Sequence, residues 1–388
     1  MQEYRLVAVY DILESSSTYE KVLKFKLYRQ ILGDCKIFLF DEEASNLGET
    51  FKDYSIGKGG IYGVGDYTKT WVIDSDYLED TRYIKCGKTV DFDLNIFTYL
   101  NKIMRGRKIN AGIDRIDIID YFNYIKANGF QYGIVTALME RVAKPLDLKI
   151  LFEMLTSFVR YDKVSQIDKT FKKVHLNIFE YNRVWKLYMN TKKQISESIQ
   201  QYDAVCCCVM KAYLIKKYDK EKNLNKKVDK FINYCLHVLN CYMEKEIVLL
   251  SLYIMEDDRV KETFKKLNKT SKKIEEQILN VAWDIYHIRL IEQIMLNDNV
   301  GRKEQIILSY FATADKGLID AMKINPIKAF VILDDYPIAF HSIRIEEICK
   351  NEDILEETAT KAAQRKERAK ITDYAEIKKQ LQKEVQSK

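Results

Sequence analysis

The sequence has little proline and glycine for its length, with three prolines and 14 glycines among 388 residues. This scarcity excludes collagen-like and linker-rich chains. An apolar content of 47%, with 26 tyrosines and 17 phenylalanines, also excludes a largely disordered chain. The sequence lacks any uninterrupted apolar stretch of about 18 residues, so we expect no membrane-spanning helix and no membrane partner. These features predict a packed protein of two or three domains.

Metal-binding cysteine pairs are also missing, because none of the eight cysteines forms a Cys-x-x-Cys motif. Three of them, Cys206, Cys207 and Cys208, are consecutive in an apolar stretch with helical character. Successive helical residues point about 100° apart, so these thiols cannot all reach one metal ion. No secretory leader pattern follows Met1. We therefore expect reduced, mostly buried thiols in a cytoplasmic protein.

The net charge of +6 is small and lies almost entirely at the C-terminal end. Residues 361–388 contain nine basic and four acidic side chains, which gives +5. We expect residues 344–388 to form a polar, basic helical tail. Such a tail is either a solvated amphipathic helix or an arm that contacts phosphates.

Glycine is unevenly distributed, since eight of the 14 precede residue 88. This contrast predicts a small Gly-rich α+β module over residues 1–87. The short segments Arg5–Tyr10, Lys36–Phe40 and Thr70–Ile73 are predicted strands, because they are rich in β-branched or aromatic residues and are separated by turn-forming residues.

Apolar residues recur three and four apart through most of the remaining chain, which predicts helices. One predicted helix spans Asp114–Ala127, and a mostly helical insertion covers about 146–270. Gln305–Ala312 and Lys328–Leu333 are instead short apolar runs, typical of buried parallel strands. We therefore expect residues 88–343 to form an α/β domain with a largely parallel sheet, with ligands at the carboxyl ends of its strands.

Three aspartates fall where this arrangement would place a site. Asp93 lies where a predicted strand leads directly into a helix, Asp284 lies in a predicted apolar helix, and Asp315 follows the strand that ends near Thr313. Asp93 and Asp315 have an alternative interpretation as helix N-caps. Asp284 is different, because a carboxylate among apolar neighbours needs a partner or a cation.

The order of these motifs resembles the PIN-domain (PIN-like) nucleases: Asp93-x-Asn95 after a first strand, a helical aspartate much later, and Thr313-x-Asp315 after another strand. The resemblance implies a three-layer α/β core whose carboxylates bind Mg²⁺ or Mn²⁺ for phosphodiester hydrolysis. It implies catalytic and metal-binding roles for Asp93, Asp284 and Asp315, with Asn95 and Thr313 in support.

The same resemblance implies an acidic residue on an early helix, for which Glu140 is the best match. Glu244 and Glu246 are alternatives, and Asp91 is a rival of Asp93 because it would face the same side of the strand. Hard divalent cations prefer carboxylate oxygens and could activate a water as the nucleophile. His287 and Arg289 follow Asp284 closely, so either could approach the scissile phosphate.

The leading hypothesis is therefore a metal-dependent endonuclease acting on RNA, in a toxin-like or phage-defence role. An inhibitor partner or a homo-oligomer is compatible with that role. The second hypothesis is a non-catalytic helical interaction protein on a degenerate PIN-like core. A third is a nucleotide-binding module that uses the Gly-rich segment 57–65, although this segment matches neither common phosphate-loop pattern. Tyr54, Tyr62, Tyr67 and Lys58 could also contact a nucleic acid strand.

Overall fold

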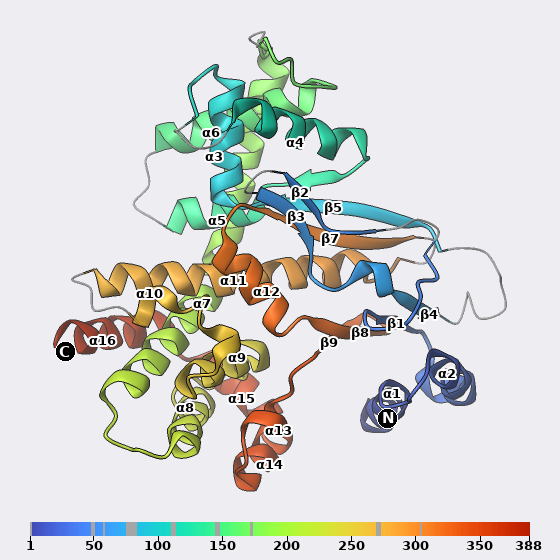
Figure 1. Ribbon diagram of the computed structural model, residues 1–388, viewed down its shortest axis with the longest axis vertical. Coiled ribbons are helices and arrows are strands. Elements are labelled where there is room, and N and C mark those ends of the chain that lie inside the picture. The colour runs from blue at the N-terminus through green and yellow to red at the C-terminus, as the bar shows by residue number, and fades with distance from the viewer. Residues whose placement is uncertain are drawn as a thin grey trace.

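The structure, a computed structural model, describes residues 2–47, 51–56, 59–74, 84–109, 114–143, 148–170, 174–268, 273–302 and 305–388. The chain is a mixed α/β protein built around two β-sheets (Figure 1). Within these ranges, no helix combines the length and the apolar character needed to cross a membrane.

The larger sheet has the strand order β2-β3-β7-β5-β6. Its strands are β2 (Tyr54–Ile56), β3 (Gly59–Gly63), β5 (Cys86–Phe92), β6 (Gln131–Gly133) and β7 (Ile306–Thr313). β5 runs parallel to both β6 and β7, whereas β3 is antiparallel to β7. Phe92 lies opposite Ala312, so β5 and β7 end side by side. The predicted strand Gln305–Ala312 is thus confirmed as a central, fully buried strand.

The smaller sheet has the order β4-β1-β8-β9 and is antiparallel throughout. Its strands are β1 (Cys35–Leu39), β4 (Trp71–Asp74), β8 (Ile327–Leu333) and β9 (Tyr336–His341). The prediction of a parallel strand over Lys328–Leu333 is therefore wrong in its direction. Asp334, with a left-handed φ of 54°, begins the two-residue turn from β8 to β9. So short a turn joins only antiparallel strands.

The first segment of the chain is helical, so the predicted strand Arg5–Tyr10 is wrong. It lies in α1 (Gln2–Leu13), which pairs with α2 (Thr18–Leu32) and covers the smaller sheet. The segment forms a helix and not a strand, because the helix places Val9 and Ile12 on one face that packs against that sheet. The predicted strands Lys36–Phe40 and Thr70–Ile73 are confirmed as β1 and β4. Strands from both sides of the predicted boundary at residue 87 pair in both sheets.

Four helices adjoin the larger sheet: α3 (Leu94–Met104), α4 (Arg115–Ala127), α5 (Val135–Ala143) and α6 (Leu148–Lys163). In Figure 1, α3, α4 and α6 lie above the sheet, and α5 lies lower, beside its left-hand end. The predicted helix Asp114–Ala127 is confirmed as α4, with Asp114 as its N-cap and Gly129 in the left-handed region just after its end.

A second apolar core forms among the helices of the later chain. Its elements are α7 (Ile178–Tyr218), α8 (Leu224–His237), α9 (Glu244–Ile254), η2 (Asp258–Val260), α10 (Lys265–Asn268) and α11 (Ile274–Asn299). The next helix, α12 (Lys316–Ile324), follows β7 and is buried through Leu318 and Met322 in the core of the larger sheet. Cys206, Cys207 and Cys208 are buried in this core, and all eight cysteines are free thiols.

The C-terminal segment is helical, as predicted. It consists of α13 (Ile345–Ile348), α14 (Glu352–Thr360), α15 (Ala362–Ala369) and α16 (Tyr374–Gln386). Leu381 and Val385 of α16 are buried against the second core, and Gln382 donates a hydrogen bond to Glu275 of α11. The tail is therefore helical, with one face of α16 packed on the second core, and its contact with phosphates stays a prediction.

Candidate functional site

Asp93 joins the ends of the two central strands. It follows β5 directly, and its Oδ1 accepts a hydrogen bond from the Ile96 amide at 2.5 Å, which caps α3. Its Oδ2 accepts one from Thr313 Oγ1 at 2.5 Å, and its own amide donates to the Ala312 carbonyl at 3.0 Å. With 3% exposure, Asp93 is held rigidly at the carboxyl end of the sheet.

Thr313 and Asp315 continue this arrangement on the neighbouring strand. Thr313, the last residue of β7, is fully buried and accepts a hydrogen bond from the Asp315 amide at 3.1 Å. Asp315 Oδ1 accepts from the Gly317 amide at 2.8 Å and caps α12. The N-cap interpretation of Asp93 and Asp315 is thus confirmed, and capping also fixes where both carboxylates lie.

Asp284 of α11 brings a third carboxylate to the same place. Burial raises its pKa to about 8, and the negative charges of Asp315, Glu140 and Asp93 contribute to the rise, while Lys266 opposes it. The charges of Asp93, Asp315 and Glu140 thus all reach Asp284. Asp93 and Asp315 are the N-caps of α3 and α12, whereas Glu140 lies in α5 and Asp284 in α11. We refer to these four residues as the carboxylate cluster.

The pKa of Asp93 is raised as well. Burial raises its pKa to about 7, with a contribution from Glu140, although the hydrogen bonds from Ile96 and Thr313 favour the charged form. At neutral pH the cluster consequently retains protons that isolated aspartates would have lost. A cation placed among these groups would displace those protons and relieve the repulsion.

Glu140 connects the cluster to a buried histidine. Its Oε2 lies 3.6 Å from Nε2 of His287, which is 3% exposed. The imidazole ring is flanked by Trp283 and Phe311, with ring centroids 5.6 Å and 5.9 Å away. His287 therefore lies beside a cluster carboxylate.

The other residues considered near Asp284 have different partners. Arg289 donates to Glu246 at 2.9 Å, and Glu246 is 1% exposed. Glu244 accepts a hydrogen bond from the Ile345 amide at 3.2 Å. Both alternatives to Glu140 thus bond from α9 to another helix: Glu244 to Ile345 of α13, and Glu246 to Arg289 of α11.

Asp91, the rival of Asp93, has a structural role. Its carboxylate accepts hydrogen bonds from the amides of Val135 and Thr136 at 3.1 Å and 3.0 Å, and from Thr136 Oγ1 at 2.6 Å. It therefore holds the N-terminus of α5, the helix that carries Glu140. Asn95 is exposed on the first turn of α3, and its supporting role stays a prediction.

The fit of a metal ion rests on the chemistry of the donors. Across the described ranges, no three His, Cys, Asp or Glu side chains are placed to hold one ion directly. Both oxygens of Asp93 already accept hydrogen bonds. The donor set consists only of carboxylates, so it suits a hard cation such as Mg²⁺, which keeps several waters and needs few direct protein ligands.

The Gly-rich segment does not form a phosphate loop in its described part. Gly57 and Lys58 lie outside the described residues, whereas Gly59–Gly63 form β3, an internal strand of the larger sheet. Tyr54 stacks on Tyr124 with ring centroids 3.6 Å apart, and Tyr67 is buried and donates to the Ser309 carbonyl at 2.6 Å. These two rings therefore have contacts within the fold, and Tyr54 and Tyr62 are both partly exposed.

Sequence reasoning missed Lys266, the cation whose charge reaches Asp284. It lies in the short helix α10, and nothing in the pattern around it distinguishes it from the chain's many other lysines. Only the three-dimensional arrangement of α10 beside α11 reveals it.

Comparisons of the chain with family models, with curated proteins and with solved structures found no match. A functional proposal for this protein therefore rests on the geometry and the electrostatics of the carboxylate cluster.

Proposed function

We propose that this protein is a metal-dependent endonuclease with a PIN-like core, and that RNA is its substrate. The observation that carries the proposal is that the charges of Asp93, Glu140 and Asp315 all reach Asp284, with Asp93 and Asp315 just beyond the adjoining ends of β5 and β7. Gathering like charges in a buried place lowers stability, so such clusters occur mainly where they serve a function.

The arrangement of the larger sheet supports the PIN-like part of the proposal. The parallel strands β6, β5 and β7 are neighbours, with α3, α4 and α6 above the sheet in Figure 1 and α11 packed against β7 below it. Ligands of α/β sheets bind at the carboxyl ends of the strands, where the cluster lies.

Each residue has a distinct task in this proposal. Asp284 and Asp315 would attract the cation, and Glu140 would complete the negative field. Thr313 holds the Asp93 carboxylate in one orientation, so this group does not have to be ordered during the reaction. Lys266, whose positive charge reaches Asp284, would attract a substrate phosphate toward it. A bound Mg²⁺ or Mn²⁺ would supply an activated water and stabilise the leaving oxygen.

The test is cleavage of labelled single-stranded RNA and DNA by the purified protein with Mn²⁺ or with EDTA. We expect cleavage of RNA with Mn²⁺ and none with EDTA. Asp93→Asn, Asp284→Asn and Asp315→Asn should each lower the rate at least about 100-fold. The matched control is Asp114→Asn, which makes the same change at an exposed helix N-cap outside the cluster.

Two results would contradict the proposal. One is cleavage that persists in all three cluster variants. The other is a folded protein that cleaves neither substrate with Mg²⁺ or Mn²⁺, which would favour the hypothesis of a non-catalytic interaction protein.

A further inference from the structure

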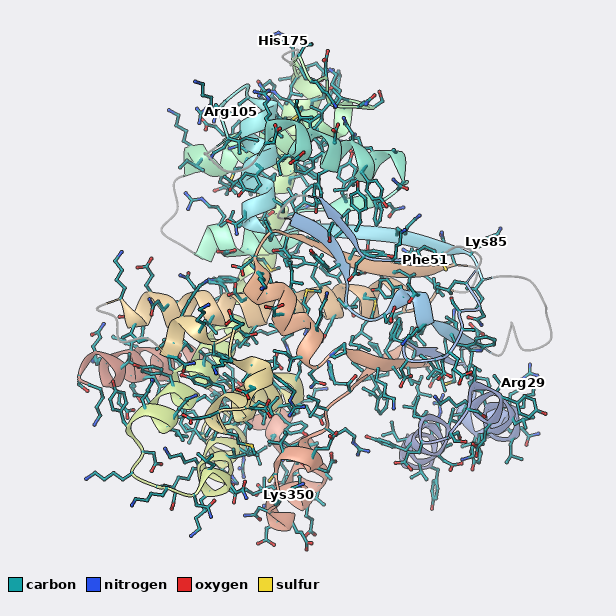
Figure 2. The ribbon with its side chains drawn as sticks, viewed as in Figure 1. Arg29, Phe51, Lys85, Arg105, His175 and Lys350 are labelled. Carbon is teal, nitrogen blue, oxygen red and sulfur yellow. The ribbon has the colours of Figure 1, made fainter. Side chains whose placement is uncertain are left out.

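A cavity of about 340 Å³ lies between the α1–α2 pair, the smaller sheet and the helices α9, α13 and α14. The helix α2 and the segment of α13 lie on opposite sides of this cavity, and they can be found in Figure 2 by the labels of Arg29 and Lys350. None of the four cluster carboxylates lines this cavity. Its volume is within the range of about 300–1,000 Å³ that is usual for small-molecule sites.

The basic groups in the cavity lining already have carboxylate partners. Lys328 pairs with Asp41 at 3.2 Å, and Arg344 pairs with Glu346 at 3.2 Å. The other two basic groups pair with carboxylates outside the lining: Lys21 with Glu42, and His341 with Glu292 at 3.2 Å. These cations are therefore poorly suited to attract an anionic ligand.

Glu244 is the contrasting group in the lining. Its one described hydrogen bond comes from the Ile345 amide, and no ion pair joins it to a basic side chain within the described ranges. Burial raises its pKa, with a contribution from the negative charge of Glu346, and the positive charges of His341 and Arg344 oppose the rise only in part. A partly buried carboxylate without a cationic partner favours a positively charged ligand.

The walls of the cavity suit the rest of such a ligand. Three aromatic rings line it, from Tyr10, Tyr242 and Phe340, together with aliphatic side chains such as Leu13 and Ile338. Aromatic faces attract organic cations, and Tyr10 already does so, because the Arg344 guanidinium lies 5.6 Å from its ring centroid.

We propose that this cavity binds a small organic cation, in which an ammonium or guanidinium group pairs with Glu244 and an apolar body lies against the aromatic walls. The site is separate from the carboxylate cluster and does not depend on the proposed nuclease activity.

The test is isothermal titration calorimetry with phenethylamine and agmatine, with 2-phenylethanol as the neutral counterpart of phenethylamine. We expect saturable binding of the amines and at least about tenfold weaker binding of the alcohol. Glu244→Gln keeps an acceptor for the Ile345 amide and removes the charge, so it should weaken amine binding about tenfold. Tyr242→Leu should weaken it several-fold.

Asp284→Asn is the control, because an amine could also be attracted to the carboxylate cluster. Binding of the amines should be unchanged in this variant. The inference is overturned if neither amine binds, if the alcohol binds as well as phenethylamine, if Glu244→Gln binds the amines as tightly as the unmodified protein, or if Asp284→Asn abolishes binding. Circular dichroism of each variant shows that it is folded.

Discussion

Asp284 and Glu292 project from the same helix about two turns apart, yet their carboxylates behave in opposite ways. Around Glu292, burial alone would raise the pKa, but the Lys245 ammonium and the hydrogen bond with His341 outweigh burial and hold the pKa at about 2. Around Asp284, burial and the neighbouring carboxylates act together and raise the pKa to about 8. The sign of the neighbouring charges therefore decides the outcome, since both groups are largely removed from water.

This difference separates a structural charge network from a candidate functional one. Lys245, Glu292 and His341 satisfy one another where α9, α11 and β9 meet. Asp284 and its neighbours share one sign of charge, and in the proposal an external cation completes them. The Lys245–Glu292–His341 network can be tested through the free energy of unfolding, and the carboxylate cluster through the change in that free energy when a cation is added.

The largest effect is expected from removing one member of the paired network. Glu292→Ala leaves the buried Lys245 ammonium without its partner, so the free energy of unfolding should fall by about 3–5 kcal/mol, as measured by urea denaturation at neutral pH. The double variant Lys245→Met with Glu292→Met should recover most of that loss. If the single variant is as stable as the double one, the pair is not a buried charge network.

In the carboxylate cluster, replacing one acidic side chain should raise the free energy of unfolding, whereas Glu292→Ala lowers it. In EDTA at neutral pH, Asp284→Asn should raise the free energy of unfolding by about 1–3 kcal/mol, because folding no longer requires this side chain to take up a proton or to carry a charge that its neighbours repel. The same variant should lose most of the stabilisation that Mn²⁺ gives the unmodified protein. A less stable variant in EDTA would mean that the Asp284 carboxylate has a favourable partner.

The pH dependence of stability should reveal the same raised pKa values. Asp93 and Asp284 have folded-state pKa values of about 7 and 8, above the unfolded value of about 3.9. The folded protein thus keeps protons that the unfolded chain has lost, and in EDTA its stability should fall as pH rises from about 5 to about 8. Asp284→Asn should flatten this decline, and Mn²⁺ should reverse it. Equal pH profiles of both proteins would contradict the assignment.

The smallest effect is expected at Asp91, whose role is to cap α5. Asp91→Ala should lower the free energy of unfolding by about 0.5–2 kcal/mol, because it removes hydrogen bonds to Val135 and Thr136. Stabilisation by Mn²⁺ should persist, whereas Asp93→Asn should reduce it. A loss of metal response in Asp91→Ala alone would reverse the roles assigned to these two aspartates.

The local parts of the site could be predicted from the sequence. A strand that runs directly into a helix placed Asp93 at a strand end, and the same pattern placed Asp315 after β7, because both features depend on a few adjacent residues. The helix of Asp284 was evident from its apolar periodicity. That these groups converge with Glu140 could be inferred only through a resemblance, since no local pattern relates α5 to α11.

The long-range parts could not be predicted. β8 has the apolar composition of a buried parallel strand, but β1, from the start of the chain, pairs with it antiparallel, and composition does not report direction. The pairing of Lys245 with Glu292 and His341 joins three separate elements. α1 was predicted as a strand because a short apolar run of six residues fits either period.

The position of α11 limits how the molecule can move. Near one end, Asn299 exchanges two hydrogen bonds of 2.8 Å with the backbone of Ile307 in β7, and Glu292 ties the same helix to β9 through His341. Both sheets are therefore hydrogen-bonded to the same helix, α11, and cannot separate as independent rigid bodies. A displacement of α10, the short helix that contacts α11, would leave both of these connections intact.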